Sequence, residues 1–271
     1  RFAQSHLTIT FGDVYLDNGD IYAAKLTGAY VADDSNVLEF KEDESCVNLD
    51  LTEVTELHAA LPWLEGTNRV ACVAEGSTIA ADNVVKGTVC QSLKLSADGG
   101  DFRPVTAFTA DQATMTVNVE GARMLMLPFA AEVPEGVKAY TIMDDQTLQE
   151  VTTIAAHQPV LVEATGLVTF RGTGDVSYAS SPLDASLRGT YVQLPLYVGD
   201  YVLGAQDGQW GWMRLTAAST LSPFDVYAQL DSKEAFISLG LTATGIVDVT
   251  ADETSDVAYY DGVISIDLST V

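Results

Sequence analysis

The chain is poor in basic residues, histidine and cysteine, and it has no long apolar run. Its 271 residues include 13 Lys and Arg against 38 Asp and Glu, which gives a formal net charge of −25. That charge repels phosphate backbones and anionic lipid headgroups, so we expect no nucleic acid as a partner. No stretch approaches the ~18 apolar residues of a spanning helix, so we expect no membrane insertion. The acidity itself indicates a solvated, self-repelling surface.

The three cysteines do not form a recognisable redox or zinc pattern. Cys46, Cys72 and Cys90 lack the close-paired spacing that such sites need, and an odd number leaves one unpaired in any disulfide scheme. Their neighbours are apolar. We therefore expect buried free thiols that act as small hydrophobic residues.

The sequence offers little for catalysis. Only His6, His58 and His157 could serve as a base, and no Gly-x-Ser-x-Gly elbow occurs. His157 is interpreted as a turn-capping or exposed imidazole. Adjacent carboxylates arise from composition alone, and neighbours on a strand point to opposite faces. We expect no enzyme, no catalytic residue and no cofactor.

Calcium is the one cation that we considered. Oxygen ligands are available at 17–20 and at 33–36, but neither stretch has the spacing of an EF-hand loop. A hairpin turn explains the first stretch. No metal site is therefore predicted, and calcium stays the alternative.

Strand signals dominate the sequence. Apolar and polar residues alternate at 7–11, 115–119 and 264–268, the period of a half-buried strand. Asn18-Gly19 and Asp207-Gly208 each separate two strand-like runs and tolerate the backbone of a tight hairpin. The chain is predicted to be all-β.

Three regions are expected. Short, unevenly spaced strands in residues 1–100 are compatible with solenoid-like rungs or with irregular β-structure. Strands at shorter spacing in 113–245 predict an antiparallel β-sandwich or barrel. Residues 246–271 are interpreted as an acidic linker with a terminal strand, and the main boundary is placed near 98–112.

Several segments carry a resemblance to a known module. They are residues 83–95, 102–110, 127–130, 133–140 and 156–162, and the hairpin formed by 201–204 and 210–212. Together they resemble a recurrent β-rich module of large secreted and cell-surface proteins of Bacteroidetes. Arg123, Met124 and Met126 depart from its usual Trp and Cys.

The resemblance implies an extracellular location. In such proteins the module follows leucine-rich or β-solenoid repeats and precedes a sorting domain. Residues 244–253, followed by 262–266, resemble the linker and first strand that lead into that domain. Because the chain starts at Arg1 without a methionine, we also expect a processed or trimmed fragment. The shared motifs specify packing and turns, and they imply no chemistry.

Two kinds of contact residue are proposed from the sequence. Sugar rings would stack on exposed aromatic side chains, for which the candidates are Trp63, Trp210, Tyr259 and Tyr260. The alternative for Trp210 is a core position, in which Gly211 makes room for a neighbouring backbone. Terminal strands would pair with another subunit through Leu7, Ile9, Phe11, Ile264, Ile266 and Leu268.

The sequence therefore predicts a non-catalytic secreted or surface module for adhesion or scaffolding. The alternatives are a carbohydrate-binding module and a subunit of a polymerising surface fibre. Its expected partners are other surface proteins, glycans or copies of itself.

Overall fold

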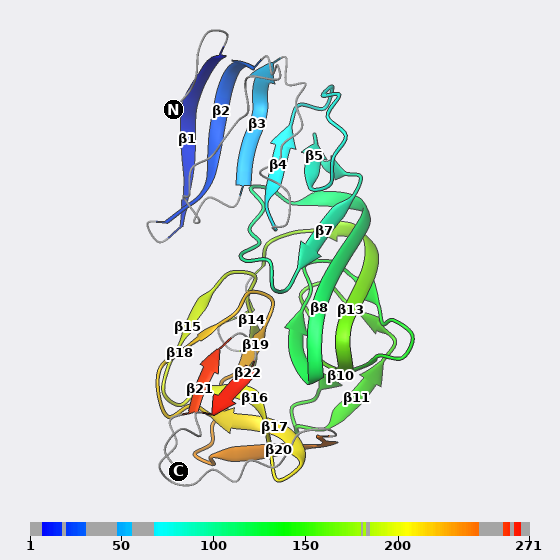
Figure 1. The fold of residues 1–271 in the computed structure, drawn as a ribbon, viewed down its shortest axis with the longest axis vertical. Helices are drawn as coiled ribbons and strands as arrows, with labels where there is room; N and C mark the ends of the chain where they lie inside the picture. Colours follow the sequence, from blue (N-terminus) through cyan, green and yellow to red (C-terminus); the bar gives the residue numbers. More distant parts are fainter. Residues whose placement is uncertain are drawn as a thin grey trace. The chain divides into compact units, whose positions relative to one another are not determined.

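The computed structural model describes residues 7–17, 20–30, 48–55, 68–179, 181–182, 185–243, 257–260 and 263–266, of which 7–17, 20–22, 24, 29–30, 55, 257–260 and 263–266 are described by their backbone alone. Every regular element in this part of the chain is a β-strand (Figure 1), so the all-β prediction is confirmed. The chain divides into two compact units. The first comprises 1–115 with 171–178, and the second comprises 116–170 with 179–271.

The first unit is built from short strands that follow two long ones. Their bounds are β1 (Leu7–Asp17), β2 (Asp20–Tyr30), β3 (Asn48–Thr55), β4 (Val70–Val73), β5 (Val84–Lys86), β6 (Val89–Cys90), β7 (Leu93–Ser96) and the beginning of β8 (Phe108–Met126). The sheet order here is β1-β2-β3-β4-β5-β6-β8. β1 and β2 pair antiparallel up to Asp17 and Asp20, the hairpin that Asn18-Gly19 predicts.

From β2 to β5 the strands run parallel, as the rungs of a solenoid do. Leu49 on β3 lies in register with Ala71 on β4, which lies in register with Val84 on β5, and all three are buried. Parallel strands buried on both faces have continuous apolar runs, as Val70–Val73 does. The stacked rungs supply the core of this unit.

Buried asparagines hold the chain segment 94–103 against the rungs. Asn83 binds both peptide groups of Lys94: its amide nitrogen donates to the carbonyl at 2.9 Å, and its side-chain oxygen accepts from the N–H at 2.7 Å. Asn68 does the same with Ser96, at 2.8 Å each way, and also donates to the Gly100 carbonyl.

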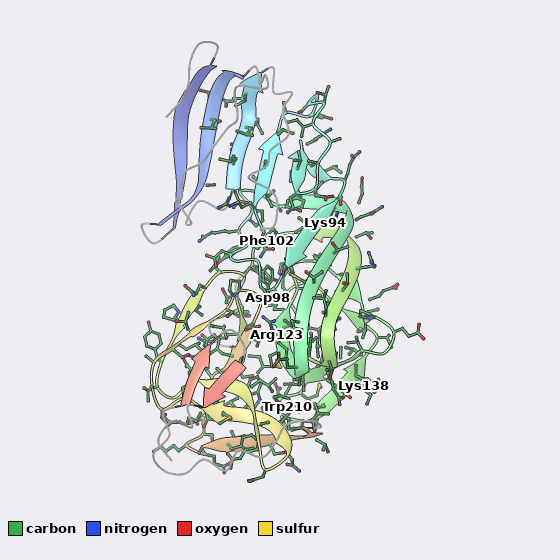
Figure 2. The ribbon with its side chains drawn as sticks, viewed as in Figure 1. Lys94, Asp98, Phe102, Arg123, Lys138 and Trp210 are labelled. Atoms are coloured by element: carbon green, nitrogen blue, oxygen red, sulfur yellow. The ribbon has the colours of Figure 1, made fainter. Side chains whose placement is uncertain are left out.

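Asn48 completes the set by donating to the carbonyl of Arg103. All three asparagines are at most 3% exposed, and each lies at or just before the start of a parallel strand. Next to Arg103, Phe102 is fully buried (Figure 2). We call this set, Asn48, Asn68 and Asn83 with residues 94–103, the asparagine clamp.

The clamp predicts a large loss of stability when one amide is removed. Asn68→Leu is expected to lower the free energy of unfolding by about 2–4 kcal/mol, because it leaves the Ser96 and Gly100 backbone groups without these bonds. Urea denaturation measures the loss. Gln91→Leu, which alters an exposed amide of the same unit, should change stability by less than about 0.5 kcal/mol. Equal losses in the two variants would contradict the role given to Asn68.

The second unit contains the rest of β8 and most of β13. Its strands are β9 (Ala131–Glu132), β10 (Lys138–Ile142), β11 (Leu148–Val151), β12 (Thr153–Ile154), β13 (Pro159–Val176), β14 (Leu187–Gly189), β15 (Leu194–Leu196), β16 (Tyr201–Gln206), β17 (Gln209–Arg214), β18 (Ser219–Leu221), β19 (Val226–Ala228), β20 (Phe236–Thr242), β21 (Val257–Tyr260) and β22 (Val263–Ile266).

Several small sheets make up this unit. β8, β13, β10 and β11 are neighbours in one sheet, and a five-stranded sheet has the order β14-β19-β16-β17-β20. Strands β15 and β18 form a pair, as do β21 and β22. The division between the two units falls inside the continuous strand β8, after Met115. It therefore lies a few residues C-terminal to the boundary proposed at 98–112.

Tight turns connect these strands where the sequence indicates them. Asp207 and Gly208 both have positive φ, at 51° and 71°, and they join β16 to β17. Such φ values at both central residues define the hairpin turn that matches strand twist. After β8, Gly136 adopts a φ of 80° in the turn that precedes β10.

A buried ion pair ties β8 to the segment before β19. Arg123 Nε donates to Asp225 Oδ1 at 2.8 Å, and the two side chains are 13% and 5% exposed (Figure 2). Beside the pair, Leu125 and Asp225 form an isolated backbone bridge, and the Met126 N–H donates to the Phe224 carbonyl at 2.9 Å. Backbone and side-chain bonds therefore join the same two segments.

Breaking this pair from one side should be costly. Arg123→Met removes the cation but leaves the Asp225 carboxylate in place, so we expect a loss of about 3–5 kcal/mol in the free energy of unfolding. The double variant Arg123→Met/Asp225→Leu should lose less than the single one, because no buried charge remains. Chemical denaturation of the wild type and the two variants measures both effects, and a double variant that loses as much stability as Arg123→Met or more would argue against the coupling.

Candidate interaction sites

Trp210 and Trp212 lie in the core of the second unit. Trp210 is 8% exposed, and a Cβ atom at Gly121 would lie 2.9 Å from its Cζ2 atom. Trp212 is fully buried and donates from Nε1 to Gln146 Oε1 at 3.0 Å. The expectation that Trp210 offers an exposed face to a sugar is therefore wrong, and the core alternative is correct.

Gly211 has the role that this alternative gave it. A Cβ atom there would lie 2.4 Å from the Ile237 carbonyl oxygen on β20, closer than any side chain tolerates. The β17–β20 pairing also shifts register between Trp210 and Gly211. Glycine therefore lets the two backbones approach between the two tryptophans.

The other aromatic candidates are not tested. Trp63 lies outside the described residues, and Tyr259 and Tyr260 belong to β21, of which only the backbone is described. A sugar contact at these three residues stays a prediction.

Each terminal strand pairs with its sequence neighbour in the same chain. The register pairs of the proposed contact residues are Leu7 with Tyr30, Ile9 with Gly28, Phe11 with Leu26, Ile264 with Tyr259 and Ile266 with Val257. Leu268 lies outside the described residues. One side of β1 is thus occupied by β2, and no described strand pairs with its other side.

Chemistry-bearing residues line up across the parallel strands of the first unit. Lys25, Asp50, Cys72, Val85 and Cys90 occupy matched positions on β2 to β6. Neighbouring strands lie about 4.8 Å apart, so Cys72 and Cys90 are about 10 Å apart and cannot form a disulfide. The row brings together a cation, a carboxylate and two thiols.

The thiols of this row are inert. Burial, with a smaller contribution from the Asp50 charge, raises the pKa of Cys72 to about 12. Burial raises the pKa of Cys90 to about 11. Both side chains therefore favour the protonated form near neutral pH, which is a poor nucleophile. The expectation of buried free thiols is confirmed for these two residues, and Cys46 lies outside the described ones.

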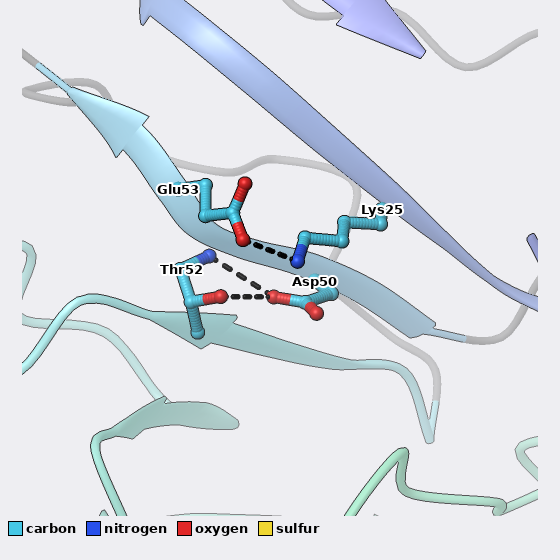
Figure 3. A network of polar contacts seen from close by, with 4 residues as sticks. All are labelled: Lys25, Asp50, Thr52 and Glu53. Atoms are coloured by element: carbon cyan, nitrogen blue, oxygen red, sulfur yellow. Dashed lines mark hydrogen bonds and ion pairs between the residues drawn. The ribbon is translucent and has the colours of Figure 1, made fainter. Parts of the chain in front are cut away.

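The polar end of the row is a structural network (Figure 3). Lys25 Nζ contacts Glu53 Oε1 at 2.5 Å, and the Thr52 hydroxyl and N–H donate to Asp50 Oδ1 at 2.6 and 3.1 Å. A carboxylate is a far weaker base than an alkoxide, so Asp50 holds the Thr52 hydroxyl without activating it. Lys25 and Glu53 offset each other's charge, and Thr52 supplies two hydrogen bonds to the buried Asp50 carboxylate.

His157 also has a structural role. Its φ is +63°, its N–H donates to the Leu127 carbonyl at 2.8 Å, and its Nδ1 atom lies 2.6 Å from the Tyr191 hydroxyl. That hydroxyl donates its single proton to the same Leu127 carbonyl at 2.9 Å, so Nδ1–H is the donor to Tyr191. The imidazole caps this turn.

Metal and small-molecule sites find little support in the described part of the chain. No three His, Cys, Asp or Glu side chains converge as metal ligands there, and the stretch 33–36 lies outside it. A recess of about 120 Å³ is lined by Ile79, Ala80, Ala81, Val84, Lys86, Val89, Gln91 and Asp111. Ligand pockets usually have at least about 300 Å³, so this one holds no more than a side-chain-sized group.

A search of the described residues for a membrane-crossing helix found none that is long and apolar enough.

A turn between β15 and β16 presents two neighbouring apolar side chains. Tyr197 is 66% exposed and Val198 is 62% exposed. The turn is held from below by Asp200, which is 7% exposed: its Oδ2 accepts from the Tyr197 N–H at 2.8 Å, and its Oδ1 accepts from Gln229 Nε2 at 3.1 Å. Because this turn is already ordered, it loses little conformational entropy on binding.

Sequence reasoning missed this turn. In the sequence, Gly199-Asp200 after two apolar residues is a turn signal. In the structure, Gly199 adopts a φ of +102°. The two apolar residues directly precede this turn, with no polar residue separating them from it. This position is the only sign in the sequence that their side chains are exposed.

The comparisons with known proteins add no identity. No protein-family model, curated protein or solved structure matches the chain.

The environment of His157 predicts a dependence of stability on pH. Desolvation lowers the pKa of the imidazole below its ordinary value near 6.5, so the folded protein favours the neutral form. Its contribution to stability is complete above pH 6.5 and is lost as the pH falls through the lowered pKa. Denaturant titrations between pH 8 and pH 5 should therefore show stability falling at the acidic end.

His157→Gln is the matched variant, because it keeps a side-chain donor but does not titrate. The difference in stability between wild type and variant should shrink as the pH falls below 6.5. A constant difference across this range would contradict the assignment. His6 and His58 contribute equally to both proteins and cancel in the comparison.

Proposed function

We propose that this chain is a non-catalytic scaffolding module of a secreted or cell-surface protein, which assembles by adding a partner's strand to the free side of β1. The observation that carries the proposal is the length of this edge. β1 spans 11 residues, is bonded on one side by β2, and ends the sheet order of the described residues.

An edge of this length favours strand addition. Every second residue of an edge strand presents both its N–H and its C=O group on the unpaired side, so a strand of 11 residues presents a regular row of donors and acceptors. An incoming strand gains main-chain hydrogen bonds whatever its sequence. The bulges after Phe11 and after Tyr15 interrupt the register, which leaves Leu7–Phe11 as the longest regular stretch.

Two features agree with an extracellular scaffold. The net charge of −25 disfavours nucleic acid and anionic lipid as partners and leaves proteins as the natural ones. The resemblance to the Bacteroidetes surface module supports a place outside the cell, where such modules follow repeats. Partners are then copies of the chain or other surface proteins.

The proposal predicts opposite effects for prolines at two neighbouring positions. Successive N–H groups of a strand point to opposite sides. Of Thr8→Pro and Ile9→Pro, one variant therefore removes a hydrogen bond to β2, and the other removes a donor on the free edge. One variant should lose stability while the other keeps its fold but loses assembly. Analytical ultracentrifugation over a concentration series, with urea denaturation of each variant, separates the two.

A truncation serves as the control. Removing residues 257–271 deletes β21 and β22 and should leave assembly through β1 intact. Loss of assembly on truncation would instead favour the terminal hairpin as the contact. A strict monomer at millimolar concentration that also fails to bind any strand peptide would refute strand addition.

A further inference from the structure

Arg214 lies beside the exposed turn and has no carboxylate partner in the described part of the chain. Its Nε atom is buried without a hydrogen-bond acceptor, and the ion pairs formed by the described residues involve other cations. A Cβ atom at Gly199 would lie 3.2 Å from Arg214 Nη2, so the guanidinium rests against the turn itself. A cation with an unpaired donor therefore lies against Gly199, in the turn that also carries Tyr197 and Val198.

We propose that Arg214, Tyr197 and Val198 form a binding site for the C-terminal carboxylate and last apolar side chain of a partner peptide. The carboxylate would accept from the Nη groups of Arg214, and the apolar side chain would cover Tyr197 and Val198. Tyrosine and arginine are the residue types that most often dominate binding energy at protein interfaces. The site is independent of β1 and of strand addition.

The arrangement of the site supports this ligand. The backbone N–H groups of Gly199 and Asp200 are already bonded, to the Leu215 and Tyr197 carbonyls at 3.0 Å each, so the turn does not need to rearrange. Gly199 has no side chain and a positive φ, which leaves room for the guanidinium. Charged donor and apolar surface are thus fixed side by side before binding.

Net charge decides between two sources of carboxylate. An acidic polysaccharide carries many charges, and a protein with a net charge of −25 repels such a polyanion. A peptide C-terminus brings a single carboxylate. Tyr197 offers a ring on which a sugar could stack, but Val198 offers only aliphatic surface, which packs against an apolar side chain.

The test uses N-acetyl-leucine and N-acetyl-leucinamide as probes, because they differ only in the carboxylate. We expect N-acetyl-leucine to shift the NMR signals of Tyr197, Val198 and Arg214 in a saturable manner. The amide should bind at least about tenfold more weakly, since it cannot form the charged hydrogen bonds. Equal binding of the two probes, or no binding of either up to their solubility, would overturn the proposal.

Variants locate the contact. Arg214→Gln and Tyr197→Ser should each weaken binding of N-acetyl-leucine about tenfold or more, whereas Arg171→Gln, at an exposed arginine on β13, should not change it. Tyr197→Ser alters an exposed side chain, so it keeps the test decisive if Arg214→Gln fails to fold. Wild-type affinity in Tyr197→Ser would overturn the proposal.

A second pair of probes distinguishes the sources. Phenylacetate represents a free apolar acid, and a galacturonate disaccharide represents an acidic sugar. Binding of N-acetyl-leucine and of longer peptides that end in leucine, with affinity rising with peptide length, supports a peptide C-terminus. A galacturonate disaccharide that binds at Arg214 more tightly than N-acetyl-leucine would overturn this choice of ligand.

Discussion

The first unit depends on one constraint, which is that buried peptide groups must find hydrogen-bond partners. Residues 94–103 run past the starts of three parallel strands, where a continuous backbone ladder is not available. The asparagine clamp solves this, because a side-chain amide has a donor and an acceptor placed like those of a peptide group. Asn83 and Asn68 each bond both groups of one residue, Lys94 and Ser96, and thus pair with alternate residues as a strand would. Without these amides, the unevenly spaced rungs would lack a cover at this end.

The second unit meets a different constraint, the close approach of its strands and side chains. Arg123 and Asp225 lie largely buried between β8 and the segment before β19, and their charges offset one another. At Gly189 a Cβ atom would lie 2.6 Å from the Met126 sulfur, and at Gly211 it would meet the Ile237 carbonyl. These contacts require glycine for lack of space, although neither residue has a positive φ. Packing, not turn geometry, sets these two positions.

The sequence predicts what is local in this structure and misses what depends on distant neighbours. The hairpin turn at Asp207-Gly208 follows from the backbone freedom of two residues, and strand alternation follows from the pleat. The pairing of β1 with β2 agrees with the turn signal at Asn18-Gly19. From the sequence, Trp210 could be either an exposed sugar contact or a core residue. Alternation shows which residues share a face of a strand, but it does not show which face of the sheet is covered. The clamp was missed because a single asparagine before a strand has no periodic signal. Arg214 was missed for a similar reason, since its lack of a carboxylate partner is a property of the fold.

Electrostatics separates the two proposed contacts from one another. Two copies that pair through β1 bring together net charges of −25 each, so added salt screens their repulsion and favours assembly. A carboxylate on Arg214 is held by attraction between opposite charges at a partly exposed site, so added salt weakens it. Strand addition through neutral peptide groups has little salt dependence of its own. Opposite responses to salt therefore distinguish a contact governed by the charge of the whole chain from one governed by a single cation.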